Sequence, residues 1–362
     1  MVSMKDVALA AGVSQPAVSY AYNKPGKLSA AQREHILAVA EQLGYPGPNI
    51  MGRSLRSGKV GAIGLMVMDK LSYAFADPSM IALLRGIGEI GELSNVALTL
   101  FPLNNQRIRK EDGKPGNTSL AVRGLVDGLI IPTMPDDHPM VRAVIQQRIP
   151  YVVVDSPMID GAHYVGIDDR GAARQQMRHL LELGHRRIGV IVDRLNPDNH
   201  RGEVDFKRFK SSTEMIVRER LTGYVEEAEE AGLAFSDLHV FEAGGFDSTV
   251  GQAAATSLLN QYAPTAIVAC SDVMALASIS AAQALQMKVP DDLSVIGFDD
   301  IAEAGNAGLT TIRQPLVEKG VYAARFLVDI LNTPPSEGDE PKRKIFQTQL
   351  VVRTSTRKLD QP

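Results

Sequence analysis

Acidic and hydroxyl side chains lie at the ends of several short apolar runs in this 362-residue chain. Asp155, Ser271 and Asp299 each follow a run with the length of a buried strand. The carboxyl ends of parallel strands lie on one side of a sheet, where such folds bind their ligands. Carboxylates accept hydrogen bonds from hydroxyl groups, so these positions predict a binding site for a polyhydroxylated ligand. One face of a ligand ring is expected to be covered by Tyr73, Phe75 or Phe246.

The first 45 residues favour three short helices. Ser3, Ser14 and Ser29 each precede a segment with a helical pattern and are expected to cap it. Gly12 supplies a tight turn between the first two helices, which gives a helix-turn-helix arrangement. In that arrangement the start of the second helix faces base edges in the major groove. The expected DNA contacts are Ser14, Gln15, Pro16, Ala17, Ser19, Tyr20 and Asn23, with Ser19 and Asn23 placed for phosphate.

This pattern alone leaves a plain three-helix domain open, and the distribution of charge favours DNA. Residues 1–60 hold seven Lys and Arg against three Asp and Glu, a formal charge of +4. Because the whole chain has a net charge of −4, the remaining 302 residues have −8. A basic module on an acidic body indicates contact with a polyanion at one end only.

From residue 60 onward, apolar runs alternate with amphipathic segments. This alternation predicts parallel sheets with helices on both faces, arranged as two similar lobes. The expected strands are 62–68, 96–101, 128–132, 151–154, 188–192, 266–269 and 293–298. The expected helices are 79–93, 138–148, 171–183, 214–231, 248–260 and 272–286. Two polar stretches, 104–118 and 194–213, are expected to be long loops without an assigned role.

Composition and motifs exclude several classes of protein. Hydrophobic residues make up 44% and charged residues 22%, which excludes a disordered or fibrous chain. No apolar run reaches the roughly 18 residues of a membrane span, and the N-terminus has no apolar segment typical of secretion. The single cysteine, Cys270, excludes an internal disulfide and fits a reducing cytoplasm. Metalloprotease, hydrolase and Walker motifs are absent from the sequence, so we expect neither an enzyme nor a cofactor.

Two local patterns have simpler explanations than ligand binding. Residues 86–91 match the G-x-G-x-x-G string of dinucleotide-binding proteins. They lie inside an amphipathic segment that begins near Ser79, however, and not at a turn from strand to helix. His179 and His185 are six residues apart, which is not the spacing of a metal site on a helix. We therefore expect no metal, and a structural hydrogen bond at His185.

Motifs along essentially the whole chain resemble the LacI/GalR family of bacterial transcription regulators. In the first module these motifs are Lys5–Ser14, Ala17–Ser19, Asn23 and Glu41–Pro46. Further along the chain they are Arg53–Gly58, Val126–Ile130, Leu183–Ile188 and Ser294–Asp300. The resemblance implies an all-α helix-turn-helix headpiece followed by an α/β core, similar to periplasmic binding proteins. This core would have two doubly wound parallel-sheet lobes.

The resemblance also implies a DNA-binding role for the segment after the headpiece. In the family this hinge becomes helical on the operator, and a leucine wedges into the minor groove. The matching residue is Leu55, flanked by Arg53 and Arg56 for phosphates. Gly52 stands where alanine is frequent and should weaken a hinge helix by about 1 kcal/mol. Tyr20 replaces the frequent arginine of the reading helix, so we do not expect the operator of a relative.

In the core, the resemblance implies the residues that bind an effector. Arg220 matches the family's effector-binding arginine, Asp299 its aspartate and Phe246 its stacking aromatic residue. Ser271 falls where several sugar-responsive members have asparagine, which leaves the ligand open. The structural alternative for Arg220 is a salt bridge, and for Asp272 and Asp300 it is helix capping. The expected effector contacts are Tyr73, Phe75, Asp155, Arg220, Phe246, Ser271 and Asp299.

The implied organisation is a headpiece at 1–47, a hinge at 48–59 and a core at 60–355. We expect the first lobe at about 60–182 and 313–335, and the second at about 183–312 and 336–355.

The implied function is that of a cytoplasmic, homodimeric repressor. Its two headpieces would bind half-sites of a palindromic double-stranded DNA operator. A metabolite of sugar or nucleoside type in the cleft would alter the angle between the lobes and hence the operator affinity. No leucine heptad follows Arg353, which favours a dimer over a tetramer. The alternatives are an activator or dual regulator, and a sugar-binding protein with the same two-lobed body.

Overall fold

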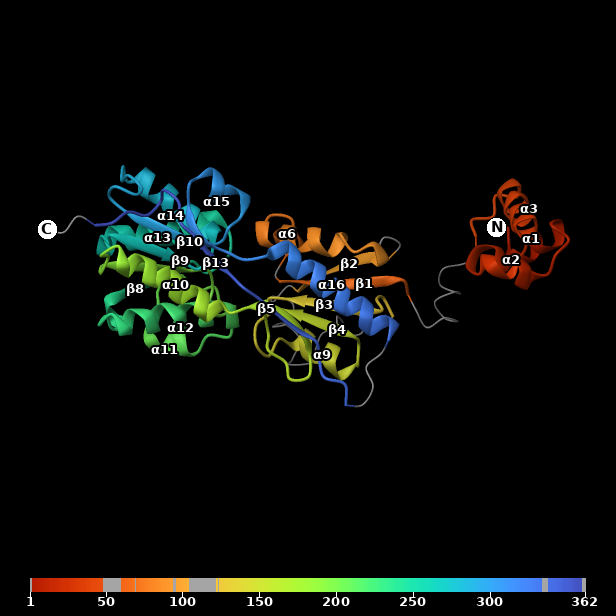
Figure 1. Cartoon of the computed structure of the whole chain (residues 1–362), viewed down its shortest axis with the longest axis horizontal. Helices are drawn as coiled ribbons and strands as arrows, with labels where there is room; N and C mark the ends of the chain where they lie inside the picture. The colour runs from red at the N-terminus through yellow and green to blue at the C-terminus, as the bar shows by residue number, and fades with distance from the viewer. Residues whose placement is uncertain are drawn as a thin grey trace. The chain divides into compact units, whose positions relative to one another are not determined.

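The structure, a computed structural model, describes residues 2–47, 60–68, 70–93, 96–103, 122, 124–333 and 338–359. It divides into two compact units, at Met1–Gly61 and Ala62–Pro362. The described part of the first unit is helical (Figure 1). Its elements are α1 (Met4–Ala10), α2 (Gln15–Asn23), the 3₁₀ turn η1 (Pro25–Lys27) and α3 (Ala30–Gln42).

The predicted caps of the three helices are confirmed. Ser14 caps α2, because its hydroxyl accepts the Ala17 N–H at 3.3 Å, and Ser29 caps α3 in the same way. At Ser3 the bond is reciprocal, since the Asp6 carboxylate accepts the Ser3 N–H. Gly12, between α1 and α2, has φ +64°, where a side chain would be strained. The helices enclose a small core of Val7, Ala8, Ala11, Val18, Ala21, Ile36 and Ala40.

The second unit contains two sheets, one in each lobe (Figure 1). The first lobe has a parallel six-stranded sheet of order β12-β5-β4-β3-β1-β2. Its strands are β1 (Ala62–Met68), β2 (Ala97–Leu103), β3 (Gly128–Pro132), β4 (Tyr151–Val154), β5 (His163–Ile167) and β12 (Arg343–Phe346). Its helices are α5 (Leu71–Ala74), α6 (Pro78–Gly88), η2 (Gly91–Leu93), α9 (Pro139–Gln146) and α16 (Leu316–Asn332).

The second lobe has a seven-stranded sheet of order β13-β11-β10-β9-β6-β8-β7, antiparallel only at its two outer pairs. Its strands are β6 (Ile188–Val192), β7 (Gly202–Glu203), β8 (Leu238–Glu242), β9 (Ala266–Ala269), β10 (Ser294–Asp299), β11 (Thr310–Arg313) and β13 (Gln349–Val351). Its helices are α10 (Asp169–Glu182), α11 (Phe206–Lys210), α12 (Met215–Glu230), η3 (Phe235–Asp237), α13 (Ser248–Tyr262), α14 (Asp272–Ala284) and α15 (Ala302–Asn306).

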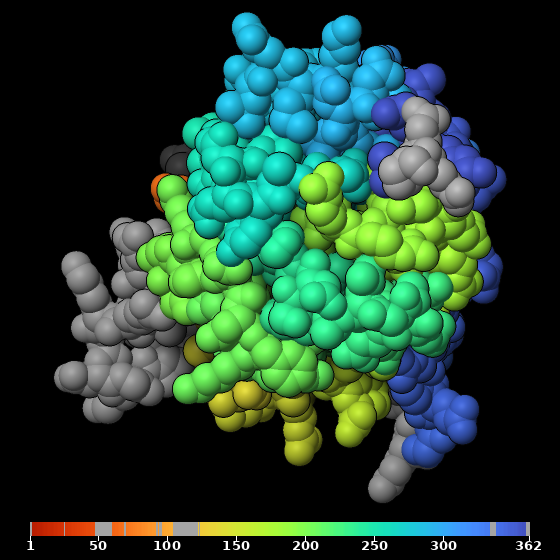
Figure 2. Space-filling view, turned by 90° about the vertical axis from the view of Figure 1, so that its left-hand side faces the viewer, coloured from red at the N-terminus to blue at the C-terminus, as the bar shows by residue number. Residues whose placement is uncertain are grey.

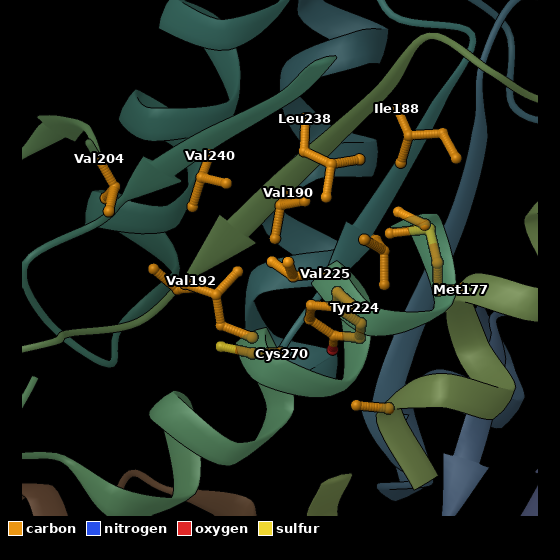
Figure 3. Close-up of a cluster of buried hydrophobic side chains, with 14 of the residues drawn as sticks. Met177, Ile188, Val190, Val192, Val204, Tyr224, Val225, Leu238, Val240 and Cys270 are labelled. Carbon is orange, nitrogen blue, oxygen red and sulfur yellow. The ribbon is translucent and has the colours of Figure 1, made fainter. Parts of the chain in front are cut away.

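The central strands of the second lobe have apolar side chains on both faces. One face packs against α10 and α12, where Val190, Tyr224 and Cys270 lie in one buried cluster (Figure 3). The other face packs against α13 and α14, where Ile191 and Met274 are buried. Helices on both faces of a largely parallel sheet define the doubly wound architecture that the sequence predicts.

The chain passes between the lobes at different places from those expected. Helix α10 packs against α12 of the second lobe, so that lobe begins before residue 169, whereas we expected it at 183. Strand β12 pairs with β5 in the first sheet, whereas residues 336–355 were all expected in the second lobe. Both elements are positioned by distant partners, which a local pattern does not identify.

The glycine-rich string at 86–91 lies in and after α6, as expected for a helix. A β-carbon at Gly86 would collide with the carbonyl oxygen of Val317 in α16. At Gly320 in α16, a β-carbon would collide with the carbonyl oxygen of Leu83 in α6. These glycines therefore allow two helix backbones to approach closely, and they form no dinucleotide turn.

Segment 194–213 is not the simple loop that the sequence predicts. It contains β7 and α11, and its Val204 and Phe209 side chains are buried in the core of the second lobe. Figure 3 shows Val204 in this cluster. Arg208 bonds the buried Glu242 carboxylate and also Asp198. The other stretch expected to be a loop, 104–118, lies outside the described residues.

Helices α10 and α12 are joined by a ladder of arginine and glutamate side chains. Glu227, 7% exposed, accepts bonds from Arg174 at 2.9 Å and from Arg178 at 2.6 Å. We expect Glu227→Gln to lower the free energy of unfolding by about 1–2 kcal/mol, because the amide has no negative charge and keeps only one of the two acceptor oxygens. Urea unfolding measures this, with Glu229→Gln on the exposed side of α12 as the control. Equal stabilities of the two variants would contradict the expectation.

No helix in the part of the chain that the structure describes is long and apolar enough to cross a membrane.

Candidate functional site

The first candidate site is the start of α2 in the headpiece. Gln15, Pro16 and Tyr20 are exposed there, while Ala17 and Ser19 are partly buried. Ser14 and Asn23 are exposed as well, although the Ser14 hydroxyl caps the helix and the Asn23 amide donates to the Ser19 carbonyl at 3.1 Å. All seven predicted residues thus lie on or next to one helix. Arg53, Leu55 and Arg56 lie outside the described residues.

The second candidate site is a cavity of about 130 Å³ between the two lobes. One water needs roughly 10–15 Å³ on the same measure, so the cavity accommodates a ligand of about ten non-hydrogen atoms, the size of a monosaccharide. A larger groove of about 940 Å³ beside α6 and α15 shares Asp299 and Gln314 with it but has fewer buried polar groups. We therefore place the chemistry in the smaller cavity.

Six of the seven expected effector contacts line this cavity: Tyr73, Asp155, Arg220, Phe246, Ser271 and Asp299. The exception is Phe75, which is 62% exposed and absent from the lining. Tyr73 and Phe75 are two residues apart around α5, and residues at that spacing point to different sides of a helical turn. The structure therefore places Tyr73 and Phe246, but not Phe75, where an aromatic ring can cover a ligand in this cavity.

Arg220 is the central cation of the cavity wall. Its Nε donates to Asp169 at 2.8 Å, and its Nη1 lies 3.7 Å from Asp299 and donates to the Cys270 carbonyl oxygen. The guanidinium also stacks on the Phe298 ring at 3.5 Å. The structural alternative for Arg220, a salt bridge, is thus also realised, but within a buried cluster that lines the cavity. These bonds fix the plane of the guanidinium.

Several residues that line the cavity are not among those predicted from the sequence. Asp193 directly follows β6, so the rule that selected Asp155 and Asp299 could have found it. Asp77 is the N-cap of α6, and its carboxylate accepts the Tyr73 hydroxyl at 2.9 Å. Lys319 lies inside α16 and Glu214 before α12, where polar residues usually face solvent, so no pattern distinguishes them.

A chain of buried polar groups in the cavity wall connects the two lobes. The Lys319 ammonium donates to Asp155 at 2.6 Å and to the Gln314 side-chain oxygen. The Gln314 amide donates in turn to Asp299 at 2.5 Å. Asp155 and Lys319 belong to the first lobe, and Asp299 ends β10 of the second. A ligand that bonds Asp299 would therefore act on a network shared by both lobes.

Asp299 and Asp193, two carboxyl groups of the cavity, ionise less readily than free ones. Burial raises the pKa of Asp299 to about 7, although the Arg220 charge and the Gln314 bond oppose this rise. Burial also raises the pKa of Asp193, and the nearby Asp77 charge adds to the effect. Such groups accept hydroxyl hydrogens when ionised and donate a hydrogen when protonated, so they suit ligands with several hydroxyl groups.

Aromatic rings from both lobes meet over the cavity. Tyr73 of the first lobe and Phe246 of the second have ring centroids 5.4 Å apart, and the Arg194 guanidinium lies 4.8 Å from the Phe246 ring centroid. Ser271 lines the cavity and caps α14, and its hydroxyl donates to Asp193 at 3.0 Å. The side chain of Cys270 is buried and donates to the same carboxylate.

The remaining polar candidates have structural roles. Asp272 accepts the Thr311 hydroxyl and the Ile301 N–H, and Asp300 forms ion pairs with Arg313 and Arg353. His185 lies between the Thr265 hydroxyl and the Arg357 carbonyl, which confirms the expected structural hydrogen bond. Among the residues that the structure describes, no group of His, Cys, Asp and Glu is arranged to hold a metal.

Comparisons with known proteins place the fold in one class. Residues 3–49 match the family model of bacterial regulatory proteins of the lacI family, and residues 177–356 match a periplasmic binding protein-like domain. An HTH-type transcriptional regulator of Mycobacterium tuberculosis is 37% identical over 94% of this chain and 92% of its own length. The HTH-type transcriptional repressor CytR of Escherichia coli K12 is 30% identical over 99% of this chain and 97% of its own.

A solved structure of the transcriptional regulator CelR in complex with cellobiose is also similar. It is 27% identical, with a TM-score of 0.66 over 98% of this chain and 100% of its own. The chain belongs to the LacI family of bacterial regulatory proteins. It is a DNA-binding transcriptional regulator with an effector-binding core, and its relatives are regulators and not enzymes.

Proposed function

We propose that the protein is a homodimeric repressor of carbohydrate or related catabolic genes. Two headpieces would bind the half-sites of a palindromic operator, and a sugar- or nucleoside-type metabolite in the cavity between the lobes would control that binding. The observation that carries the proposal is the cavity itself, whose size suits a monosaccharide and whose wall combines Arg220, Asp193 and Asp299 with two aromatic rings.

The ligand class follows from the chemistry of the cavity wall. Buried carboxylates and one guanidinium form paired bonds with neighbouring hydroxyl groups, and Tyr73 and Phe246 offer apolar faces for a ring. The cavity lining has more carboxylates than cations, so a phosphate group would meet net repulsion. The cellobiose bound to CelR supports a sugar as effector for this chain too.

The proposal has three further parts, which are the palindromic operator, the homodimer and repression as the output. A palindromic operator requires two headpieces related by two-fold symmetry. Apolar side chains suited to a second copy are exposed in the first lobe, at Ile81 on α6 and Leu98 on the edge strand β2. The repressor CytR supports repression as the output. The alternatives are an activator or dual regulator and, with less support, a sugar-binding protein without regulatory output.

One experiment tests the proposed function as a whole. Operator DNA is selected from random duplexes with the full chain, and a panel of neutral sugars and nucleosides is screened by thermal shift. We expect a palindromic site, and at least one panel compound that both raises the melting temperature and changes operator affinity in a gel shift. Binding of a compound without any change in operator affinity would refute regulation and favour the plain binding protein.

A further inference from the structure

The two lobes make a polar contact that lies outside the cavity. Asp136, in the connection from β3 to α9 of the first lobe, accepts a bond from Arg218 in α12 of the second lobe at 2.7 Å. The backbone N–H of Asp136 donates to the Thr213 carbonyl at 2.8 Å. Neither Asp136 nor Arg218 lines the cavity.

The partners of Asp136 are held firmly in the second lobe. Arg218 also donates to the Ser212 carbonyl at 2.7 Å, which fixes its direction. The Asn196 side chain accepts both the N–H and the hydroxyl of Thr213, at 3.0 and 3.1 Å. Segment 194–213, to which the sequence assigns no role, therefore presents a preformed docking point for the loop of the first lobe.

In each lobe, the residues that form this contact are close in sequence to residues that line the cavity. Pro132 and Thr133, three or four residues before Asp136, line the cavity, as do Glu214 and Val217 beside Thr213 and Arg218. In Figure 2 the green surface of the second lobe meets the yellow surface of the first lobe along the lower part of the view. Moving the lobes apart at the cavity would therefore break the bonds at Asp136.

We propose that Asp136 and Arg218 are positioning residues that hold the lobes closed over the effector without contacting it. The inference rests on the proposed function, in that the cavity is taken to bind the effector. Because these two side chains are 34% and 27% exposed, the pair is partly screened by water. Its loss should therefore speed effector release about threefold and should not abolish binding.

The first test measures lobe separation without any effector. Spin labels are attached to the full chain through Gln146→Cys in α9 and Lys207→Cys in α11, both exposed positions. The native Cys270 is buried and should remain unlabelled. Pulsed electron resonance then gives the distribution of distances between the lobes. We expect Asp136→Asn and Arg218→Gln each to broaden this distribution towards longer distances, and Arg218→Lys, which keeps the charge, to preserve it.

A matched control separates the contact between lobes from the simple loss of an ion pair. Arg170 and Glu226 form a partly exposed pair within the second lobe, between α10 and α12. Arg170→Gln should leave the distance distribution unchanged. A distribution that is the same in Arg218→Gln as in the wild-type protein, with the fold intact by circular dichroism, would overturn the inference.

The second test uses the panel sugar with the largest thermal shift in the wild-type protein. Its dissociation rate should rise about threefold in Asp136→Asn and in Arg218→Gln, with no further increase in the double variant, because both changes remove one interaction. If the two substitutions had additive effects on the dissociation rate, or if the rate stayed unchanged, the proposed positioning role of Asp136 and Arg218 would be overturned. If no panel compound binds but the distances still shift, the proposed effector class fails while the contact between the lobes stands.

Discussion

The Arg220→Ala variant is expected to lose the effector response while its headpiece still binds operator. Arg220 is 7% exposed, and its guanidinium is held by Asp169 and the Cys270 carbonyl with one edge near Asp299. Truncation of Arg220 removes the main positive charge from a cavity wall that has several carboxylates. We expect affinity for the panel sugar to fall about 100-fold or more, because a fully desolvated, charge-assisted contact is lost.

The same truncation leaves Asp169 and Asp299 buried without their cation, which should also destabilise the core by about 3–5 kcal/mol. A second variant, Arg220→Met with Asp169→Asn, removes the arginine together with its closest charge partner. We expect this double variant to recover much of the free energy of unfolding but none of the affinity for the sugar. The loss of effector binding can then be separated from partial unfolding.

Titration calorimetry with the panel sugar and a gel shift with selected operator measure the two activities. The control is Arg187→Ala, which removes an exposed arginine from the same lobe. It should match the wild-type protein in both assays. Sugar affinity in the Arg220 variants within threefold of wild type would show that this cavity does not bind the effector.

The parts of the fold that the sequence predicts well are the fully buried parallel strands. β1, β3, β4, β6 and β9 have the predicted bounds, because a strand covered on both faces is a continuous apolar run. β5 and β8 were missed. Their sequences, HYVGI and LHVFE, include polar residues at an end or within the strand.

The crossovers between the lobes could not be predicted from local patterns. β12 is four residues long, with exposed Arg343 and Ile345, and pairs with β5 about 180 residues away in the sequence. Its residues resemble those of an exposed loop until a neighbouring strand provides hydrogen-bond partners. The assignment of α10 to the second lobe likewise depends on its packing against α12.

The candidate cavity was predictable where a side chain directly follows a strand. Asp155, Ser271 and Asp299 were found in this way, because the fold brings such positions together. Lys319 is different, since a lysine in a helix is normally exposed and only the tertiary structure shows that it is 1% exposed against Asp155. Phe75 shows the converse, since it is close to Tyr73 in sequence but lies outside the cavity lining, because the two side chains point in different directions around a helical turn.

The Asp299 carboxyl should make the stability of the core depend on pH near neutrality. Its pKa is raised by burial from 3.8 to about 7 in the folded protein. An acid with a raised pKa contributes stability that is fully present below pH 3.8 and is lost as the pH rises through about 7. At pH 8 the folded protein must hold an ionised Asp299 beside Asp77 and Asp193, at a cost of a few kcal/mol.

Asp299→Asn keeps the shape of the side chain and removes this ionisation. We expect the free energy of unfolding of the variant, relative to wild type, to increase by a few kcal/mol between pH 4 and pH 8, and to level off above about pH 8. The comparison with wild type is needed because other groups titrate in the opposite sense. Burial lowers the pKa of His138 to about 4, for example, so its contribution is lost as the pH falls.

Urea unfolding at intervals of one pH unit measures the difference between the two proteins. Asp160→Asn, at an exposed position, controls for the change in net charge. A difference that stays constant from pH 5 to pH 8 would show that Asp299 is already ionised throughout this range in the folded protein. The Arg220 charge would then outweigh burial at this carboxyl. In that case the cavity would offer a permanent anion to its ligand near neutral pH, and effector affinity should show no dependence on pH from Asp299.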